Sequence, residues 1–535
     1  MQQSFELSSG EKRLAATLFS PESGLRGAAL LVFPLAEERK GALPFFVAFA
    51  RSLEAAGFAS LLFDFAGTGD SEGDFACLPE GQFQTDLSAA HEWLRARYPD
   101  LPLVLCGLRT GAVLAQQYAA AHPDFRKVVC WSPVAGKNFV NQLLQRRMVN
   151  DMVAYGKARA SRAALLESLE AGRSVDLDGY VFVSAVYRTL KELVACDPGV
   201  PVFTTPATVK YPPFWNTVGH VDLDGLIRET LLQITADSTF AAHPQNAAPP
   251  ALPASCTGET GGARYIWDKP QGTPESGLLF LHGWSGDRTG PHRLFVQFAR
   301  QMAKNGTLCL RVDFIGRGLS DGVASDASIA GMTETAEACL VELRKALPAG
   351  APVQVAAICS GCKVAITLAA AHPELDCLLL WSAESMGSLR AGATSRRKRW
   401  HTLLTYARKL TSPETWKKLL TGKVNSKLVA KALAQKAEVR SAEEAATEDA
   451  TLEKFRSYRN PVHFFFGGSD PDAKGSSAAY EAFCRNNKIP FSLDWIPNAG
   501  HSYYGAAWTR QLLDFSERYL VKRGNGFKLS KLGFE

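Results

Sequence analysis

The sequence predicts an α/β protein made of two copies of one doubly wound domain. Short apolar runs alternate with helical patterns along most of the chain, which is typical of parallel sheets covered by helices on both faces. Several segments recur, in the same order, at a spacing of 249 or 250 residues. In the second copy, one strand pattern runs through a turn of small residues into an Ala-rich helix.

The repeat sets the expected domain organisation. It is carried by Phe49-Ala50-Arg51, which recurs at residues 298–300, by residues 64–69, which align with residues 313–318, by Ala121-His122-Pro123, which recurs at residues 371–373, and by Trp131-Ser132, which recurs at residues 381–382. We expect a first domain over residues 1–239 and a second over residues 263–535. Residues 240–262 are rich in Pro and Ala without an apolar period, so they are expected to form a linker.

The element patterns are clearest in the second copy. The expected strands are Leu278–Leu281, Leu308–Asp313, Val353–Ile358, Cys377–Trp381, Val462–Phe466 and Phe491–Trp495, and the expected helices are Leu294–Lys304, Ile329–Leu347 and the stretch that ends near Ala371. The ligand site of a doubly wound sheet lies beyond the carboxyl ends of its strands. Candidate site residues therefore belong to the loops that follow these strands.

Composition and charge exclude few classes of function. Of the 535 residues, 46% are hydrophobic and 21% are charged, and the net charge is +6, as in ordinary globular proteins. No apolar run approaches the roughly 20 residues that span a bilayer, and the first residues show no signal-peptide pattern, so we expect a cytoplasmic protein without a transmembrane segment. Eleven cysteines, mostly in apolar runs, suggest reduced thiols, ten of them structural or incidental.

The segment Val353–Ala365 carries the expected chemistry. It reads as a strand, a sharp turn and a helix, which is the context of a nucleophile elbow, and Cys359 stands at its tip. Ser360 as the nucleophile would put the bulky Ile358 and Cys362 at the tight flanking positions. A thiolate at a helix N-terminus beside a His is stabilised, so Cys can replace Ser here.

Cys359 and Cys362 also form a Cys-x-x-Cys pair, as in thiol redox proteins. Redox exchange does not need the Asp and His residues that follow later in the chain, so their presence favours acyl chemistry over redox chemistry.

Loops after other strands supply the remaining groups for acyl transfer. Asp470 follows the strand at residues 462–466 and is the expected acid, with Asp472 as the alternative. His501 follows the last strand and is the expected base. The backbone N–H groups of Ser360 and Trp284 are expected to hold the oxyanion. No cofactor and no metal is expected.

These motifs resemble those of the α/β-hydrolase superfamily over nearly the full chain. The resemblance is carried by His282-Gly283-Trp284, residues 313–320, the elbow, Gly468-Ser469-Asp470 and Gly500-His501. Through residues 33–38, 67–74, 107–112 and 213–215, the first half is similar to the exosortase A system-associated hydrolase of the second type. The second half is similar to the companion hydrolase of the first type, whose elbow also carries Cys. The resemblance implies a bacterial protein near extracellular-polysaccharide and protein-sorting functions.

The first copy departs from the catalytic pattern. Arg109 stands at the position of Cys359, and Pro34-Leu35 replaces the His-Gly of the oxyanion loop. A guanidinium at this tip either binds a carboxylate or phosphate ligand or pairs with an internal carboxylate such as Glu37 or Glu38. We therefore expect the first copy to be non-hydrolytic, with a binding or scaffolding role.

A basic segment interrupts the second copy over residues 383–460, where this superfamily inserts a lid. Between Ala383 and Arg440, 14 Lys and Arg residues stand against three Glu, a net charge of +11, so the rest of the chain carries −5. Apolar residues recur within it at helical spacing, which predicts an amphipathic helical cap. Its positive charge has three possible roles: the charged face is simply solvated, it attracts an anionic acyl substrate such as a coenzyme A thioester, or it makes weak contact with an anionic membrane surface. Few aromatic residues lie among the charges, so no nucleic acid partner is expected.

The sequence therefore predicts a hydrolase or acyltransferase that acts on small-molecule carboxylic esters or thioesters through a Cys-His-Asp triad in the second domain. The alternative is a non-enzymatic pair of pseudo-hydrolase domains that binds an anionic ligand or a partner protein.

Overall fold

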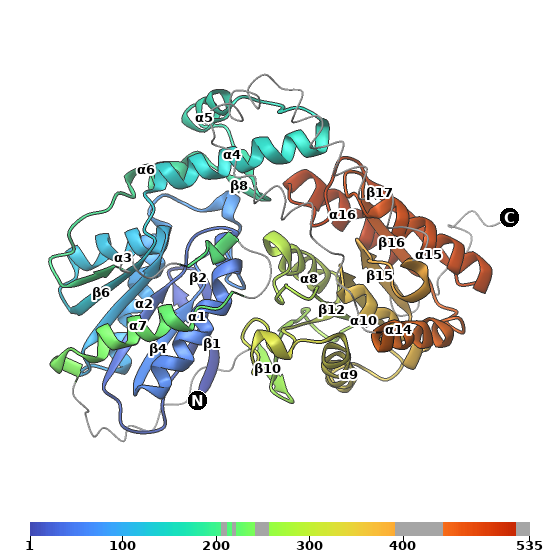
Figure 1. Ribbon diagram of the computed structural model, residues 1–535, viewed down its shortest axis with the longest axis horizontal. Coiled ribbons are helices and arrows are strands. Elements are labelled where there is room, and N and C mark those ends of the chain that lie inside the picture. Colours follow the sequence, from blue (N-terminus) through green and yellow to red (C-terminus); the bar gives the residue numbers. More distant parts are fainter. Residues whose placement is uncertain (205–210, 217–220, 241–255, 391–441, 521–535) are drawn as a thin grey trace.

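Two α/β domains follow one another in a computed structural model of the chain, each built on its own sheet (Figure 1). The structure describes residues 1–204, 211–216, 221–240, 256–390 and 442–520. Residues 241–255, most of the expected linker, and residues 391–441, most of the basic segment, lie outside the described residues. Within the described residues, no helix combines the length and the apolar character needed to cross a bilayer.

The first sheet has seven strands in the order β1-β2-β4-β3-β5-β6-β9. These are β1 (Gln2–Ser9), β2 (Lys12–Phe19), β3 (Gly27–Val32), β4 (Phe58–Phe63), β5 (Leu103–Leu108), β6 (Phe125–Trp131) and β9 (Val202–Thr204). The pairings of β1 with β2 and of β2 with β4 are antiparallel, and the others are parallel. Helices α1 (Glu38–Ala55) and α7 (Asp224–Thr235) cover one face, and α2 (Gln82–Arg97) and α3 (Thr110–Ala121) cover the other.

A helical insertion follows β6 and reaches the second domain. It comprises α4 (Gly136–Tyr155), α5 (Arg162–Glu170), the hairpin of β7 (Val175–Leu177) and β8 (Tyr180–Phe182), and α6 (Ser184–Glu192). In Figure 1 it forms the upper arm, which extends toward α16. Tyr155 stacks on Trp508 of α16 with ring centroids 6.2 Å apart, and Ser469 Oγ donates to the Ala154 carbonyl oxygen at 3.3 Å. The first domain therefore contacts the loop that carries Asp470.

The second sheet has eight strands in the order β10-β11-β13-β12-β14-β15-β16-β17. These are β10 (Thr257–Thr260), β11 (Ala263–Asp268), β12 (Ser276–Leu281), β13 (Thr307–Val312), β14 (Val353–Ile358), β15 (Cys377–Trp381), β16 (Val462–Gly467) and β17 (Phe491–Ile496). The two pairings at the β10 edge are antiparallel, and the others are parallel. Strand β10 lies within the residues expected to form the linker.

Helices cover both faces of the second sheet. Helices α8 (Leu294–Lys304) and α16 (Ala506–Tyr519) pack on one face, and α9 (Ile329–Lys345), α10 (Gly361–Ala371), α14 (Ala442–Phe455) and α15 (Ala473–Asn487) pack on the other. Every residue of β12 to β16 is buried, because helices lie above and below. This explains why these strands read as continuous apolar runs rather than alternating ones. The fold class expected from the sequence is confirmed.

The two domains meet through arginines at equivalent positions of the repeat. Arg51 of α1 donates to the carbonyl oxygens of Ser320 (2.7 Å) and Gly322 (3.1 Å) in the second domain. Arg300 of α8, its counterpart, donates to the carbonyl oxygens of Asp70 (2.6 Å) and Ser71 (3.0 Å) in the first. Such reciprocal contacts are typical of an interface with two-fold symmetry. The two copies are therefore arranged as a pseudo-symmetric pair within one chain.

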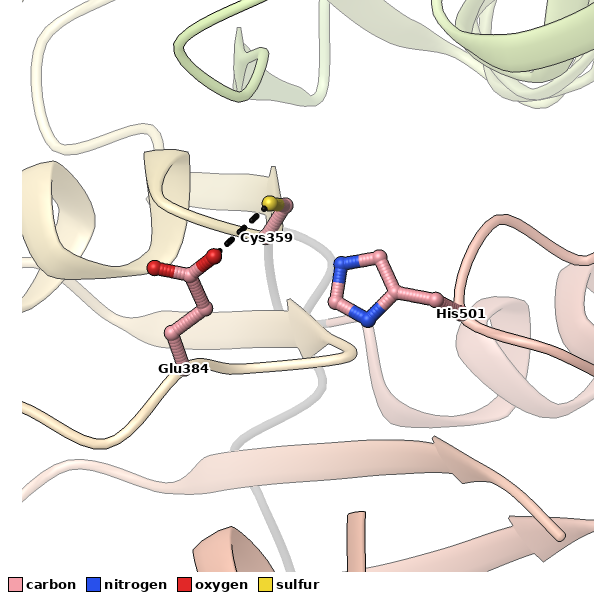
Figure 2. Close-up of side chains that lie close together, drawn as sticks. All are labelled: Cys359, Glu384 and His501. Carbon is pink, nitrogen blue, oxygen red and sulfur yellow. Dashed lines mark hydrogen bonds between the residues drawn. The ribbon is translucent and has the colours of Figure 1, made fainter. Parts of the chain in front are cut away.

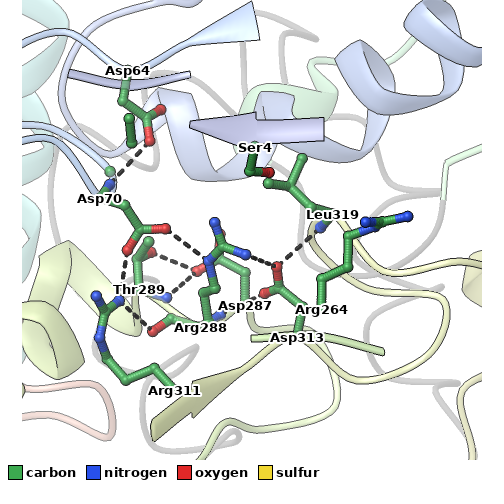
Figure 3. Close-up of polar contacts among 12 residues, drawn as sticks. Ser4, Asp64, Asp70, Arg264, Asp287, Arg288, Thr289, Arg311, Asp313 and Leu319 are labelled. Carbon is green, nitrogen blue, oxygen red and sulfur yellow. Dashed lines mark hydrogen bonds and ion pairs between the residues drawn. The ribbon is translucent and has the colours of Figure 1, made fainter. Parts of the chain in front are cut away.

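A buried ion cluster lies at this interface (Figure 3). Asp70 of the first domain accepts hydrogen bonds from Arg288 Nε at 2.7 Å and Arg311 Nη1 at 2.6 Å in the second. Burial alone would raise the pKa of Asp70, but the two guanidinium groups outweigh it and hold that pKa well below its usual range. Leu319 occupies the equivalent position in the second copy, so this cluster breaks the symmetry of the pair.

Candidate active site

Cys359 lies at the tip of the turn between β14 and α10, where the backbone is strained. Its φ is 60°, a conformation that residues other than Gly rarely adopt. The Cys359 N–H donates to the Trp381 carbonyl oxygen at 3.0 Å, which ties the turn to the neighbouring strand β15. Gly361 lets α10 start close to β12, because a Cβ there would lie 2.4 Å from the Leu281 carbonyl oxygen. This geometry is that of a nucleophile elbow.

His501 and Asp470 form a hydrogen-bonded pair beside the elbow. Asp470 follows β16 and His501 follows β17, and these parallel strands are neighbours, so their carboxyl ends bring the two side chains together. Nδ1 of His501 donates to Oδ2 of Asp470 at 2.8 Å. Burial lowers the pKa of His501, but the hydrogen bonds with Asp470 and Cys359 outweigh it and raise the pKa to about 10. The imidazole is therefore held as an imidazolium.

The structure brings Asp470 to His501 and gives Asp472 a different place. Asp472 stands at the start of α15, and its backbone N–H donates to Oδ1 of Asp470 at 3.1 Å. Of the two carboxylates that the sequence offered as the acid, the one hydrogen-bonded to His501 is Asp470.

Glu384, which the sequence did not single out, reaches the nucleophile from the loop after β15 (Figure 2). The Cys359 thiol donates to Glu384 Oε1 at 3.3 Å. The other oxygen, Oε2, lies 3.2 Å from Nζ of Lys363, a fully buried lysine on α10. Burial raises the pKa of Glu384, but the charge of Lys363 and the hydrogen bonds from Cys359 and Lys363 together outweigh it, and the net shift is downward. Glu384 is therefore an anion in contact with the thiol.

A signal for Glu384 was available in the sequence. It follows Trp381 by three residues, and β15 lies next to β14 in the sheet, so its loop had to lie close to the elbow. Val113 and Val134 stand at the first-copy positions that correspond to Lys363 and Glu384. The anion and its buried lysine therefore belong to the second copy alone.

Helix α14, at the far side of the basic segment, is attached to this site. Glu448 of α14 lies 3.5 Å from Lys363 Nζ and accepts hydrogen bonds from Arg390 Nη2 (2.9 Å) and the Gly387 N–H (2.7 Å). Glu448 thus links the two described flanks of the segment, Gly387–Arg390 and α14, and it does so next to Lys363, the lysine that contacts Glu384. The expected helical cap between them, over residues 391–441, lies outside the described residues.

The two residues expected to form the oxyanion hole contact each other. The Trp284 N–H donates to Ser360 Oγ at 2.7 Å, so the Ser360 hydroxyl occupies this donor in the structure. Gly283 lies directly against the nucleophile, since a Cβ at this position would be 3.0 Å from Cys359 Cβ and 3.3 Å from Sγ. The loop after β12 therefore lines the elbow, as its position in the sheet predicts.

The elbow of the first copy holds an internal ion pair. Arg109 has a φ of 59°, and its Nε and Nη2 each donate to the Glu38 carboxylate at 3.2 Å. The guanidinium also donates to Gln142 and lies over the ring of Trp215, 4.8 Å from its centroid. Of the two roles considered for Arg109, pairing with an internal carboxylate is the one that the structure contains.

Cys362, the partner in the Cys-x-x-Cys motif, is directed away from the site. All eleven cysteines are free thiols. The buried Cys362 thiol donates to the carbonyl oxygens of Ala357 (3.4 Å) and Trp381 (3.5 Å). Cys359 and Cys362 therefore have different environments, and Cys359 alone faces His501.

Solved structures of several hydrolases are similar to parts of the chain. Est1E from Butyrivibrio proteoclasticus, solved with ferulic acid bound, is 18% identical over 49% of this chain and 98% of its own, with a TM-score of 0.35. An α/β serine hydrolase homologue from Coxiella burnetii is 12% identical over 48% and 92%, with a TM-score of 0.32. The acylaminoacyl peptidase of Pyrococcus horikoshii is 14% identical over 50% and 41%, with a TM-score of 0.34.

Sequence profiles of two families match, one in each half. The profile described as "Serine aminopeptidase, S33" matches residues 43–172, and the profile described as "Alpha/beta hydrolase family" matches residues 278–514. Among curated proteins, none matches the chain. Each of the two profile matches lies within one of the two domains described above, and the chain therefore consists of two α/β-hydrolase domains in tandem.

Proposed function

We propose that the second domain cleaves carboxylic esters or thioesters, or transfers their acyl group, through Cys359, His501 and Asp470. One observation carries this proposal. A thiol at a strained elbow lies within 4.8 Å of a histidine whose other ring nitrogen is hydrogen-bonded to a carboxylate. This is the arrangement of nucleophile, base and orienting acid that acyl transfer requires.

In the proposed reaction, the Cys359 thiol first loses its proton to solvent, and the resulting thiolate attacks the acyl carbon beside the imidazolium of His501. The N–H groups of Ser360 and Trp284 receive the oxyanion after the Ser360 hydroxyl has rotated away from Trp284. Collapse of the intermediate expels the leaving group, which takes its proton from His501, and leaves an acyl thioester on Cys359. Water or another acceptor then gives its proton to His501 and attacks the thioester, which releases the Cys359 thiolate beside the imidazolium.

In this proposal the first domain is a non-hydrolytic support. The ion pair of Arg109 with Glu38 occupies the place that a nucleophile would need. The insertion of the first domain, through Ala154, contacts the loop next to Asp470. We therefore assign residues 1–239 a scaffolding role and residues 263–535 the catalytic one.

The resemblance to exosortase A system-associated hydrolases supports a finer proposal. On that basis the protein is bacterial, cytoplasmic and connected with extracellular polysaccharide or protein sorting. The net charge of +11 between residues 383 and 440 supports an anionic acyl substrate, such as a coenzyme A or phosphopantetheine thioester.

The test compares the full chain with its Cys359→Ala variant on short acyl esters and acyl thioesters. We expect Cys359→Ala to abolish turnover and leave the unfolding midpoint nearly unchanged, while Cys196→Ala, at an exposed thiol, keeps full activity. Activity retained in Cys359→Ala would refute the assignment. A folded wild-type protein without any thiol-sensitive turnover would instead favour a non-enzymatic pair of domains that binds an anionic ligand or a partner protein.

A further inference from the structure

Three side chains of the second domain can converge on one metal ion. Sγ of Cys359, a carboxylate oxygen of Glu384 and a ring nitrogen of His501 all lie within 4.8 Å of one another. The three come from different loops, after β14, β15 and β17. Figure 2 shows them facing a common space, with one imidazole nitrogen directed toward Cys359.

The ligand types and spacing suit Zn²⁺. Zinc takes thiolate, imidazole and carboxylate ligands at about 2.0–2.3 Å, so two ligand atoms of a tetrahedral site lie roughly 3.3–3.8 Å apart. The distance of 3.3 Å between Cys359 Sγ and Glu384 Oε1 already falls in this range. Small side-chain rotations can bring the third ligand to it, and the fourth position is left for water.

Two of the three ligands are held in place by a second residue: Asp470 holds His501, and Lys363 holds Glu384. Nδ1 of His501 is bound to Asp470, which directs Nε2 toward Cys359 and Glu384. Lys363 holds Oε2 of Glu384, which leaves Oε1 for an ion. A carboxylate behind a histidine ligand fixes its tautomer and ring orientation and strengthens its bond to the metal.

The charges also balance. A thiolate and a carboxylate together neutralise the two charges of Zn²⁺, and around them the positive charges of Lys363 and Arg390 equal the negative charges of Glu448 and Asp470. The first copy has Arg109 and Val134 at the positions of Cys359 and Glu384, so these positions offer no ligand there. The same elbow therefore gives a metal site in only one of the two copies.

We propose that Zn²⁺ binds reversibly to Cys359, Glu384 and His501 and thereby blocks the nucleophile. Binding forms bonds from zinc to sulfur, oxygen and nitrogen, and the thiol proton and the proton on His501 Nε2 leave to solvent. No electron is transferred. The binding stands on the geometry alone, whereas the block of acyl chemistry rests on the function proposed above.

Binding is measured on the metal-free, reduced full chain by titration with Co²⁺, followed by displacement with Zn²⁺ against a chromogenic chelator. We expect one equivalent of Co²⁺ to give a thiolate-to-cobalt absorption band in the near ultraviolet, and Zn²⁺ to remove it. Cys359→Ser should abolish the band. Glu384→Gln should weaken Zn²⁺ binding by at least the roughly 10- to 100-fold that is lost when a residue behind a metal ligand is replaced, because it removes a ligand itself.

Two further measurements make the result decisive. The double variant Cys77→Ala, Cys196→Ala removes the two exposed thiols and should bind Zn²⁺ like the wild type. Circular dichroism of each variant is measured to check that it is folded. Cys359→Ser replaces sulfur by oxygen and is therefore the variant expected to disturb the elbow least. A band that survives Cys359→Ser, or Zn²⁺ affinity unchanged in both Cys359→Ser and Glu384→Gln, would overturn the proposal.

The failure of this inference is distinguishable from failure of the proposed function. If Zn²⁺ does not bind but Cys359-dependent turnover is present, the metal site alone is refuted. If Zn²⁺ binds stoichiometrically but no turnover is found, the site stands and the hydrolase proposal fails. With both correct, Zn²⁺ inhibits turnover at the concentration at which it binds, and a chelator restores activity.

Discussion

Arg109 and Cys359 occupy the same strained turn in the two copies of the repeat. Their φ angles are 59° and 60°, and their N–H groups donate to the carbonyl oxygens of Trp131 (2.9 Å) and Trp381 (3.0 Å). The strained turn is thus kept in a copy that has no nucleophile. The strain alone is not a mark of catalysis, and the neighbouring side chains decide what the turn can do.

Arg109→Ala should leave ester cleavage within about two- to threefold of the wild type. It should also destabilise the first domain by about 3–5 kcal/mol, because it leaves the buried Glu38 without its guanidinium partner. Turnover and urea unfolding measure the two effects separately. A loss of turnover as deep as that of Cys359→Ala would show that the first copy takes part in the chemistry.

Asp470→Asn should reduce kcat on the order of 10⁴-fold, because the histidine loses the anion that orients it and stabilises its imidazolium. Asp472→Asn is the matched control and should remain near wild-type activity. Steady-state kinetics on an activated ester decide between them. The opposite ranking would make Asp472 the acid.

Gly283→Ala should lower kcat by at least an order of magnitude with little change in stability. Its Cβ would stand 3.0 Å from Cys359 Cβ, closer than ordinary contact, so either the nucleophile or the oxyanion loop must shift. Gly225→Ala, on α7 with no atom within 4 Å of its added Cβ, is the control and should be neutral or slightly stabilising. Equal activities of the two variants would contradict the close approach.

Asp70→Asn should destabilise the joined domains by about 3–5 kcal/mol, because it leaves Arg288 and Arg311 buried without their shared anion. Glu80→Gln removes an exposed carboxylate that pairs with Arg188, and should cost at most about 1 kcal/mol. Chemical unfolding of both variants gives the comparison. Similar costs would mean that the buried cluster contributes no more than a surface pair.

Glu37 should make stability depend on pH in the acidic range. Burial between the domains raises its pKa from the usual 4.5 to about 7, and this outweighs Lys40 and the hydrogen bonds from Tyr504 and the His292 N–H. The folded protein thus holds this proton more tightly than the unfolded chain. The resulting stabilisation is complete below about pH 4.5 and is lost as the pH rises through about 7.

The measurement for Glu37 is the unfolding midpoint between pH 4.5 and 7, for the wild type and for Glu37→Gln. The wild type should lose stability relative to the variant as the pH rises across this interval. Parallel curves would show that Glu37 has the same proton affinity in both states.

The strands around the site were predictable because they are buried on both faces. Val353–Ile358 and Cys377–Trp381 have the bounds that the sequence indicates, and β12 begins only two residues before the expected Leu278. Asp470 and His501 follow the neighbouring strands β16 and β17, and the carboxyl ends of parallel strands lie at the same edge of the sheet. Their positions in the chain were therefore enough to predict that the two side chains lie close together. The repeat fixed the register of the elbow by setting Arg109 opposite Cys359.

Contacts between distant segments could not be predicted in the same way. The neighbouring strands β14 and β15 place the loop after β15 near the elbow, but which of its side chains reaches Cys359 depends on the path of the loop, and no local pattern encodes that path. Likewise, the packing of the two copies rests on single side chains such as Arg51 and Asp70, whose partners lie more than 200 residues away. A charged residue in a loop carries no local sign that it will be buried by a second domain.

The identity of the nucleophile is the central claim, and one experiment tests it directly. The reduced full chain is treated with an electrophilic probe that acylates active-site nucleophiles, and the modified residue is located by peptide mass spectrometry. We predict a single modification on Cys359, which is lost when His501 is replaced by Ala. Modification of Ser360 instead, or equal labelling of the exposed Cys77 and Cys196, would contradict it.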